Sequence, residues 1–409
     1  MPDMTGSIVD DDLFAPNVIA DPYSYYGHLR ENDPVHWNAL HEVWIVTRYD
    51  DVTWLTRHPR IFSSSVPQKD PRDPYPPINP DDWDDFQTVR SNMTGRIITT
   101  DRPPHRDQRA ALHSYFTPAM MERWRPMVRS AVADLIDAAD NGGRMDVMND
   151  VAIPLPLMVI SELMAIPKAD RPYVRSIAEK MLVGPLQSPS RMHDVATSMA
   201  KMDEYITPIV EERFANPGDD LISVLLLGEK AGAFTREQVM RNIAFFVVAG
   251  HETSINLICN GLLAFIRNPA QWELLRTAPS DLAVSATEEC LRFDPPVPSI
   301  ERIATEDVTL RDKEIKELDR VRWSIAAANR DPRRFAEPDD FDITRNPNPH
   351  IAFGHGIHMC LGMSLARLEG QEVFAAMAPR FPELRLETKE LEYAPAIHIR
   401  SLRALEVSW

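Results

Sequence analysis

Cys360 lies in a short loop with two glycines that directly precedes an amphipathic segment, and this combination of residue types is suited to binding a metal. The loop runs from Phe353 to Gly362 and reads FGHGIHMCLG. Gly354 and Gly356 permit positive φ angles and therefore a tight turn. A cysteine near a helix N-terminus is biased toward the thiolate, because free backbone N–H groups and the helix dipole favour negative charge there. The loop therefore predicts a thiolate ligand.

Three other interpretations of this loop stay open. An isolated cysteine is also common as a small buried residue. His355, His358 and Cys360 could bind zinc, but no nearby CxxC pair supplies a fourth ligand. A dinucleotide-binding loop requires GxGxxG, and Met359 stands where the third glycine is needed.

A second candidate, AGHET from Ala249 to Thr253, follows an apolar run within a long helical pattern. A glycine inside a helix costs about 1 kcal/mol relative to alanine. Gly250 is therefore a point where the helix can open and admit water or a small ligand beside the Glu252 carboxylate and the Thr253 hydroxyl. The alternative is that Gly250 only makes a packing contact.

Two groups of charged residues are further candidates. Glu289 and Arg292 are three residues apart and share a helix face, as a functional pair or as an ordinary exposed one. Arg102, Arg106 and Arg109, against one aspartate, give residues 102–113 a net charge of +2 in a chain of −17. This stretch predicts either a solvated basic surface or a site for an anion or a partner.

The elements that must position these residues can be read from capping and periodicity. Thr235 and Gln238 form the pattern of a capping box at the start of a long helix that ends near Asn268, before Pro269. A second helix is predicted from Ser280 or Asp281 to Phe293, and a third from just after Cys360 to about Ala378-Pro379. Short strands are predicted at 34–37, 43–46, 320–323 and 397–400, and an irregular surface segment at 66–85.

Composition excludes several classes of protein. The 409 residues are 44% hydrophobic and 26% charged, which is typical of a globular protein. A net charge of −17 disfavours nucleic acid or an anionic membrane as the main partner. No segment approaches the roughly 18 uninterrupted apolar residues of a membrane span. The acidic N-terminus is unlike a signal peptide, and three widely spaced cysteines indicate a reducing compartment, so we expect a cytoplasmic protein.

Taken together, these motifs resemble the cytochrome P-450 family from about Asp21 to the C-terminus. Residues 353–362 match the family pattern FxxGxxxCxG, residues 289–292 match ExxR, and residues 249–253 match AGxET, in the family order. The segments 329–332 and 341–345 resemble the family's meander. The resemblance implies a mainly α fold with small β-sheets (α+β), a triangular helical prism around a buried haem. It implies one haem-binding domain over 1–409, with its β-rich part mainly at 20–62 and 297–325 plus C-terminal strands.

The resemblance also implies roles for individual residues. Cys360 would be the axial thiolate ligand of the iron of haem b. Glu252 and Thr253 would deliver protons during oxygen activation. Phe353 would shield the sulfur, and Gly356 would let the loop pass close to the porphyrin. The haem propionates would be held by His105, Arg109, Arg302 and His358, the rest of the haem-binding surface would include Ala249, Gly250, Gly354 and Gly362, and a structural charge network would comprise Glu289, Arg292 and Arg345.

The implied activity is monooxygenation, the insertion of one oxygen atom from O2 into a hydrophobic small molecule by hydroxylation or epoxidation. Electrons would come from NAD(P)H through a separate ferredoxin reductase and ferredoxin, since no flavin or iron–sulfur domain follows Trp409, and the ferredoxin would dock at residues 102–109. We expect a monomer. A haem-binding sensor or carrier without catalysis is the alternative, which the Glu252-Thr253 pair disfavours, and a colourless zinc-binding interaction protein is a second one.

Substrate contacts are predicted by similarity of position. The apolar character of the candidates indicates a hydrophobic substrate such as a terpenoid, steroid, fatty acid or polyketide. The candidates are Trp83, Phe86, Met93 and Ile97 in the proline-rich loop, Phe245 and Val248 on the long helix, Val297 and Ile300 after the second helix, and Ile397 near the C-terminus. One departure from the family concerns residues 311–320, RDKEIKELDR, which lack the usual glycine and proline and put the local hairpin in doubt.

Overall fold

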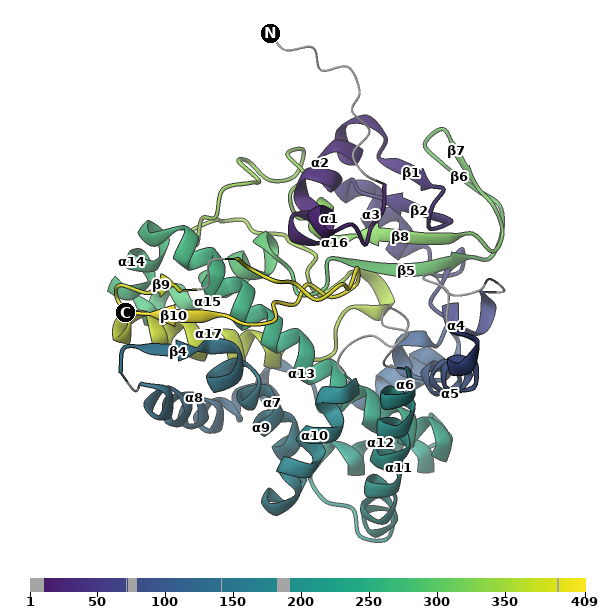
Figure 1. Ribbon diagram of the computed structural model, residues 1–409. Helices are drawn as coiled ribbons and strands as arrows, with labels where there is room; N and C mark the ends of the chain where they lie inside the picture. The colour runs from purple at the N-terminus through teal and green to yellow at the C-terminus, as the bar shows by residue number, and fades with distance from the viewer. Residues whose placement is uncertain (1–10, 71, 73–78, 141, 182–191, 388–389) are drawn as a thin grey trace.

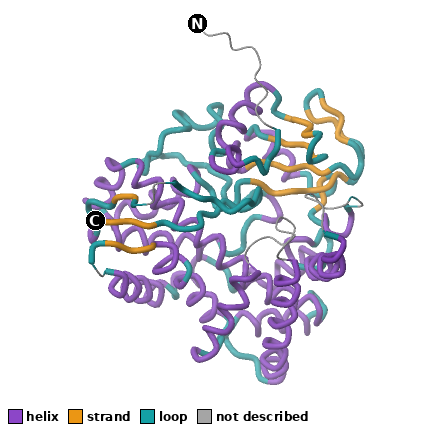
Figure 2. Tube along the Cα trace, viewed as in Figure 1, coloured by secondary structure: helices purple, strands orange, loops and turns teal. Residues whose placement is uncertain are grey.

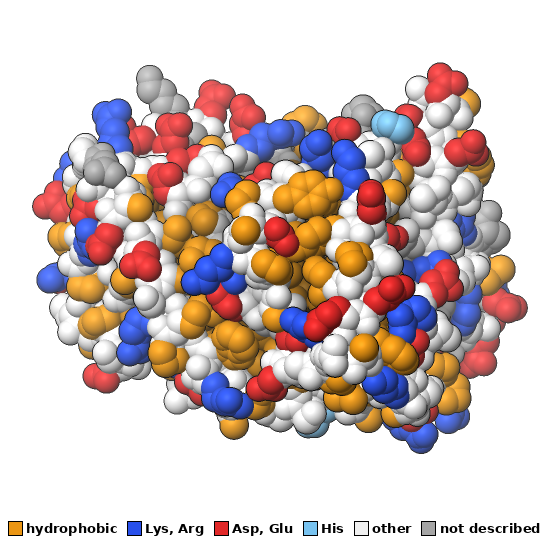
Figure 3. Space-filling view, turned by 90° about the horizontal axis from the view of Figure 1, so that it is seen from below, with side chains coloured by type: hydrophobic (Ala, Val, Ile, Leu, Met, Phe, Trp, Pro, Cys, Tyr) orange, Lys and Arg blue, Asp and Glu red, His pale blue; other side chains and the backbone are white. Residues whose placement is uncertain are grey.

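Most of the chain is helical, and the strands gather at one side of the molecule and along one edge (Figures 1 and 2). This computed structural model describes residues 11–70, 72, 79–140, 142–181, 192–387 and 390–409. Helices α8 (Arg125–Ala139) to α12 (Leu221–Lys230) lie at the bottom of Figure 1, and α1 (Pro16–Ala20), α2 (Pro22–Asn32) and the largest sheet lie at the top. Seen from below, acidic and basic side chains are interspersed over the helical face, so the negative net charge is not gathered there (Figure 3).

The long helix α13 (Arg236–Arg267) passes through the centre of the fold. It begins at the predicted capping box, in which Thr235 Oγ1 accepts from the Gln238 N–H at 3.2 Å and Gln238 Oε1 accepts from the Thr235 N–H at 3.0 Å. Its C-terminal half is almost entirely buried. In length and composition α13 could cross a membrane, but 67% of its most apolar window is buried inside the protein, which marks it as a core helix.

Helices α15 (Pro279–Phe293) and α17 (Met363–Arg380) pack against each other and against α13, close to the predicted bounds. Gly261 of α13 makes this close approach possible. A Cβ atom at that position would lie 2.5 Å from the Phe374 ring of α17 and 3.0 Å from Cys290 Sγ of α15. The three helices thus form one rigid layer behind the cysteine loop.

The largest sheet has the strand order β1-β2-β8-β5-β3, with β2 and β8 parallel and the other pairs antiparallel. Three of its strands lie where the sequence predicted them. The predicted strand at 397–400 is wrong, because Pro395 removes a donor just before it and the Arg400 N–H bonds to the Pro296 carbonyl at 2.9 Å. The strands are β1 (Val35–Asn38), β2 (Val43–Val46), β3 (Phe62–Ser63), β5 (Ser299–Ala304) and β8 (Arg320–Ser324).

The hairpin that the sequence put in doubt is formed. Strands β6 (Val308–Leu310) and β7 (Lys313–Ile315) pair antiparallel, with Leu310 opposite Lys313. Arg311 takes the left-handed conformation, at φ 57°, that glycine adopts without cost. Its side chain donates to Asp51 Oδ2 at 2.6 Å, which helps to hold the turn.

A separate sheet lies beside the helical layer. β10 (Glu406–Ser408) pairs with β4 (Arg144–Asp146) on one side and β9 (Arg385–Leu386) on the other. The C-terminal strands are therefore not part of the largest sheet.

The sequence predicted an irregular segment at 66–85, and this prediction is only partly correct. The segment contains the short helix α4 (Val66–Lys69), a 3-10 turn at Pro80–Asp82 and the first residues of α5 (Trp83–Met93). Asn79 Oδ1 accepts from the Asp81 N–H at 3.2 Å, and Asp84 and Asp85 lie in the first turn of α5, where the helix dipole favours them. Residues 71 and 73–78 lie outside the described residues.

The remaining helices surround this core. They are α1 (Pro16–Ala20), α2 (Pro22–Asn32), α3 (Tyr49–Arg57), α6 (Pro104–His113), α7 (Pro118–Glu122), α8 (Arg125–Ala139), α9 (Pro154–Leu163), α10 (Arg171–Met181), α11 (Met192–Ala215), α12 (Leu221–Lys230), α14 (Pro269–Thr277) and α16 (Ile325–Ala328).

Candidate active site

The cysteine loop is held in a closed turn. The Cys360 N–H donates to the Phe353 carbonyl at 2.9 Å, and Gly354 and Gly356 have φ angles of 73° and 78°. A Cβ atom at Gly356 would collide with the carbonyl oxygen of Thr56 at the end of α3. A glycine is therefore required at position 356 both by the backbone conformation and by the close approach of Thr56. The family resemblance implied that Gly356 allows a close approach to the porphyrin, and it did not predict this contact with Thr56.

Cys360 is exposed, whereas Cys259 and Cys290 are buried among core helices. Although part of Cys360 is exposed, desolvation by the surrounding protein atoms raises the pKa of its thiol, while the Gly362 N–H and the charges of Arg109 and Arg367 oppose that rise. A bound cation would add to these opposing effects, so the position suits a thiolate ligand. Among the described residues no group of three or more His, Cys, Asp and Glu side chains could hold a metal ion, which disfavours the zinc interpretation.

A group of cationic and donor side chains lies beside the loop. The rings of His105 on α6 and His358 are 4.1 Å apart, centroid to centroid, and Arg302 from β5 and Arg109 act electrostatically on both. Burial and these arginines lower the pKa of His105 to about 4 and that of His358 to about 2. Both ring nitrogens of His105 are buried and have no hydrogen-bond partner among the described residues. Such a cluster fits the carboxylates of a ligand.

Asp101 lies near this cluster and acts electrostatically on His105 and Arg302, but no ion pair joins it to either side chain among the described residues. Asp101 accepts hydrogen bonds from Ser63 Oγ at 2.5 Å and from the Ser64 N–H at 2.9 Å, and Ser64 Oγ lies 2.7 Å from His358 Nε2. Arg302 and His358 also line a small cavity against α3, together with Leu55, Thr56, Pro59, Phe62, His355 and Ile357.

One stripe of α13 is partly exposed although the helix crosses the core. Phe245, Val248, Ala249, Glu252 and Thr253 are half-buried, at the spacing of a single helix face, whereas the side chains on the opposite face are buried. Thr253 Oγ1 donates to the Ala249 carbonyl at 2.9 Å. We call these five residues the α13 stripe.

Glu252 has no hydrogen-bond partner among the described residues. Burial raises the pKa of its carboxyl group to about 8, so the group is mainly protonated at neutral pH. A protonated carboxyl and an adjacent hydroxyl can donate protons in sequence.

Gly250 also makes the packing contact that the sequence left open as the alternative. A Cβ atom at this position would lie 3.3 Å from Ile160 Cδ1.

The predicted charge network is brought together in the layer behind the loop. Glu289 accepts from Arg292 through two bonds of 2.8 Å, from Arg345 Nε at 3.3 Å and from Asn348 Nδ2 at 3.0 Å. Arg292 also donates to the carbonyls of Asn329, Pro338 and Asp340. Glu289 and Arg292 have no exposed surface, so the ordinary exposed pair is excluded.

The predicted substrate contacts do not form one group. The sequence predicted a loop for Trp83, Phe86 and Met93, but these residues lie on helix α5. Ile97 begins a 3-10 turn. Phe86 and Ile97 are buried in the main core, which leaves Trp83 and Met93 with accessible surface. Val297 and Ile300 are half-buried and pack on a second core beneath the largest sheet.

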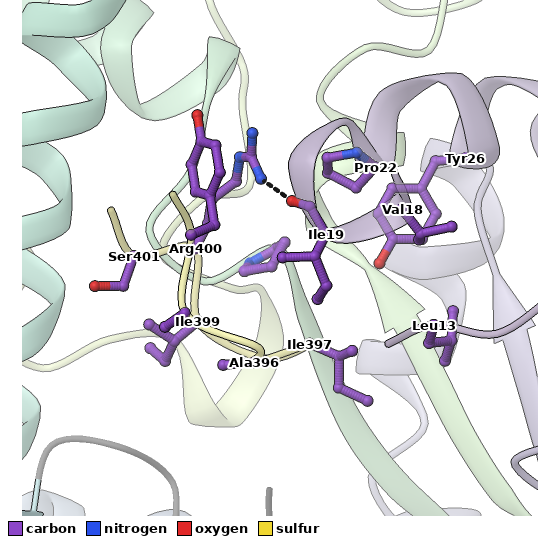
Figure 4. A pocket seen from close by; sticks show the side chains of 13 residues that line it. Leu13, Val18, Ile19, Pro22, Tyr26, Ala396, Ile397, Ile399, Arg400 and Ser401 are labelled. Carbon is purple, nitrogen blue, oxygen red and sulfur yellow. Dashed lines mark hydrogen bonds between the residues drawn. The ribbon is translucent and has the colours of Figure 1, made fainter. Parts of the chain in front are cut away.

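Ile397 lies apart from the α13 stripe. It lines a small cavity between α1 and the C-terminal loop, next to Leu13, and the Arg400 guanidinium reaches across to the Ile19 carbonyl at 2.8 Å (Figure 4). Neither Cys360 nor any residue of the α13 stripe lines this cavity.

Several residues near the site were not predicted. Arg367 lies over the Phe353 ring, with its guanidinium carbon 4.6 Å from the ring centroid, and pairs with Glu288 at 2.7 Å. Ser254 Oγ donates to Glu369 of α17, which is buried. The only sequence signal for Arg367 was its position one helical turn after the loop, and Glu369 had none.

The accessible thiol, the unpaired donors beside it and the acid–alcohol pair on the α13 stripe define a haem-thiolate protein. A family profile described as "Cytochrome P450" matches residues 282–394. The chain is 32% identical over 395 residues to the "Biotin biosynthesis cytochrome P450" of Bacillus subtilis (strain 168), covering 96% of this chain and 97% of that protein. It is 34% identical over 412 residues to the "Cytochrome P450 monooxygenase PikC" of Streptomyces venezuelae, covering 98% and 94%.

A solved structure gives the same result. The "myxobacterial cytochrome P450 CYP267B1 in complex with myristic acid" superposes with a TM-score of 0.86 at 31% identity, covering 98% of this chain and 99% of that one. The chain belongs to the cytochrome P450 family. It is an oxygenase that binds haem b, and the predicted α+β fold class is confirmed.

Proposed function

We propose that this protein inserts one oxygen atom from O2 into a hydrophobic small molecule, using electrons from NAD(P)H delivered by a ferredoxin reductase and a ferredoxin. The observation that carries the proposal is the Glu252-Thr253 pair, half-buried and on the same helix face as Phe245 and Val248. An apolar surface next to two proton donors suits oxidation of an unactivated C–H bond. A sensor or carrier of haem would not need the pair.

The residues would divide the work as follows. Haem b bound through a cysteine thiolate supplies the binding of O2 and the cleavage of its O–O bond. Cys360 would hold the iron, and the group of donors beside it would hold the propionates. Glu252 and Thr253 would pass protons toward the oxygen, and the buried Glu289–Arg292 pair would keep the loop in place.

The support for a ferredoxin is a basic surface near Cys360. Arg57, Arg102 and Arg106 are exposed, at the end of α3 and around α6, and Arg109 acts electrostatically on the Cys360 thiol. Opposite charge on an acidic carrier would steer it to this surface. We also infer a cytoplasmic monomer, in keeping with three free cysteines.

The test is spectroscopic and then enzymatic. We expect the reduced protein to give the strongly red-shifted carbon monoxide band of thiolate-ligated haem, and Cys360→Ser to lose it while Cys259→Ala keeps it. Substrate-dependent NAD(P)H consumption with surrogate ferredoxin partners should follow. A normal band without any coupled oxidation, across a broad substrate panel, would support the sensor or carrier instead.

A further inference from the structure

Arg96 lies at one end of the α13 stripe. It precedes the 3-10 turn at Ile97–Thr99, and its guanidinium carbon is 5.8 Å from the centroid of the Phe245 ring. Its Nε donates to the Asn92 carbonyl at 2.9 Å, and its two terminal nitrogens have no hydrogen-bond partner among the residues described here. Half-buried arginines normally use these nitrogens, so the fork of Arg96 is free to bind an anion.

The charges around Arg96 do not neutralise it. Arg241, one helical turn before Phe245, is already engaged by the Thr94 carbonyl and hydroxyl at 3.0 Å and by Glu237 at 2.6 Å. Asp203 of α11 attracts both arginines from a distance, but no ion pair joins it to either among the described residues. Burial and Arg241 lower the pKa of Arg96 only to about 10, so it is charged at neutral pH.

Helix α13 sets the distance between Arg96 and the Glu252-Thr253 pair. Phe245 and Thr253 are eight residues apart on the same face of α13, which corresponds to about 12 Å along the helix axis. Apolar side chains occupy the stripe between Arg96 and the Glu252-Thr253 pair, namely Phe245, Val248 and Ala249. Arg96 thus places a cation at one end of the α13 stripe, the proton donors lie at the other end, and an apolar surface lies between them. This arrangement is complementary to an amphiphile with an anionic head.

We propose that Arg96 binds the carboxylate of a long apolar carboxylic acid and thereby directs oxidation to a carbon remote from that carboxylate. The guanidinium fork matches the two oxygens of a carboxylate, and the Phe245 ring shields the contact from water. This inference rests on the proposed monooxygenase function and specifies its substrate class.

The test compares myristic acid with its methyl ester and with 1-tetradecanol, which keep the chain and remove the charge. Binding to the ferric holoenzyme is measured by the shift of the Soret band. We expect the acid to bind at least about tenfold more tightly than the ester, as charge-assisted hydrogen bonds predict. Arg96→Gln should remove this preference, Arg96→Lys should keep part of it, and Arg123→Gln, at an exposed position just after α7, should keep all of it.

Three results would overturn the inference while the proposed function stands, two in binding and one in the position of oxidation. One is equal binding of acid and ester by wild-type protein that gives the red-shifted carbon monoxide band. The other is an Arg96→Gln variant that weakens acid and ester alike, which would make Arg96 a structural residue. Oxidation of myristic acid next to its carboxyl group would also contradict it. Absence of the band from wild-type protein would overturn the proposed function itself, and this inference with it.

Discussion

Glu289 and Arg292 form a completely buried ion pair on α15, joined by two hydrogen bonds of 2.8 Å. Arg292 donates its other protons to three backbone carbonyls in the segment 329–340, and Glu289 receives Arg345 and Asn348 just before the cysteine loop. Each charge is therefore satisfied only when this segment is in place. The pair connects the helical core to the loop that presents Cys360.

Replacing Arg292 by methionine should destabilise the protein strongly. The variant leaves the Glu289 carboxylate without its main partner in the core, which costs about 3–5 kcal/mol in the free energy of unfolding. Urea unfolding and the haem-to-protein absorbance ratio measure the effect. The matched control is Arg276→Met on α14, whose partner Glu273 is at the same spacing with two bonds of 2.6 Å but at the surface. If both variants lose equal stability, the network has no special role.

Thr253→Ala should uncouple electron consumption from oxidation. Without the hydroxyl at this end of the α13 stripe, proton delivery fails and reduced oxygen leaves as hydrogen peroxide. We expect NAD(P)H consumption to continue while product per NAD(P)H falls several-fold, measured by peroxide assay and product quantification. Thr253→Ser retains a hydroxyl and should remain close to wild type. Unchanged coupling in the alanine variant would exclude Thr253 from proton delivery.

Glu369 should make the stability of the protein depend on pH. Burial raises the pKa of its carboxyl group to about 8, from 4.5, and its one described partner is Ser254. Between these two pH values the folded protein holds a proton that the unfolded chain has released, so the free energy of unfolding falls as pH rises from about 4.5 to about 8.

Glu369→Gln should remove this contribution. The free energy of unfolding of wild type minus that of the variant should therefore decrease from pH 5 to pH 8, by an amount on the order of a few kcal/mol. Glu211→Gln, at an exposed position on α11, is the control and should leave the pH profile of wild type unchanged. A flat difference between wild type and Glu369→Gln would show that the carboxyl titrates normally.

Reduction by a ferredoxin should depend on salt if the basic surface near Cys360 receives it. Raising the salt concentration from about 0.05 to about 0.5 M shortens the range of the attraction and should slow reduction several-fold in stopped-flow measurements. Arg106→Glu on α6 should slow it at low salt, whereas Arg276→Glu on α14, at the opposite side of Figure 1, should not. Salt-insensitive reduction would place the docking surface elsewhere.

The sequence by itself determined the parts of the site that follow from local chemistry. Gly354 and Gly356, the capping box at Thr235 and Gln238, and the spacing of Glu289 and Arg292 are short-range patterns. Each depends on a backbone conformation or a helical repeat that a few neighbouring residues specify. They sufficed to predict the thiolate loop, the long helix and the family.

Only the tertiary structure decided what each side chain meets. The strand expected at 397–400 is lost because Arg400 bonds to Pro296, about a hundred residues away, and the hairpin at Arg311 forms without a glycine because Asp51 holds the turn. Burial of Phe86 and exposure of Trp83 on one helix, and the meeting of Arg96 with Phe245, also require the folded chain. Long-range packing assigns partners that no local propensity contains.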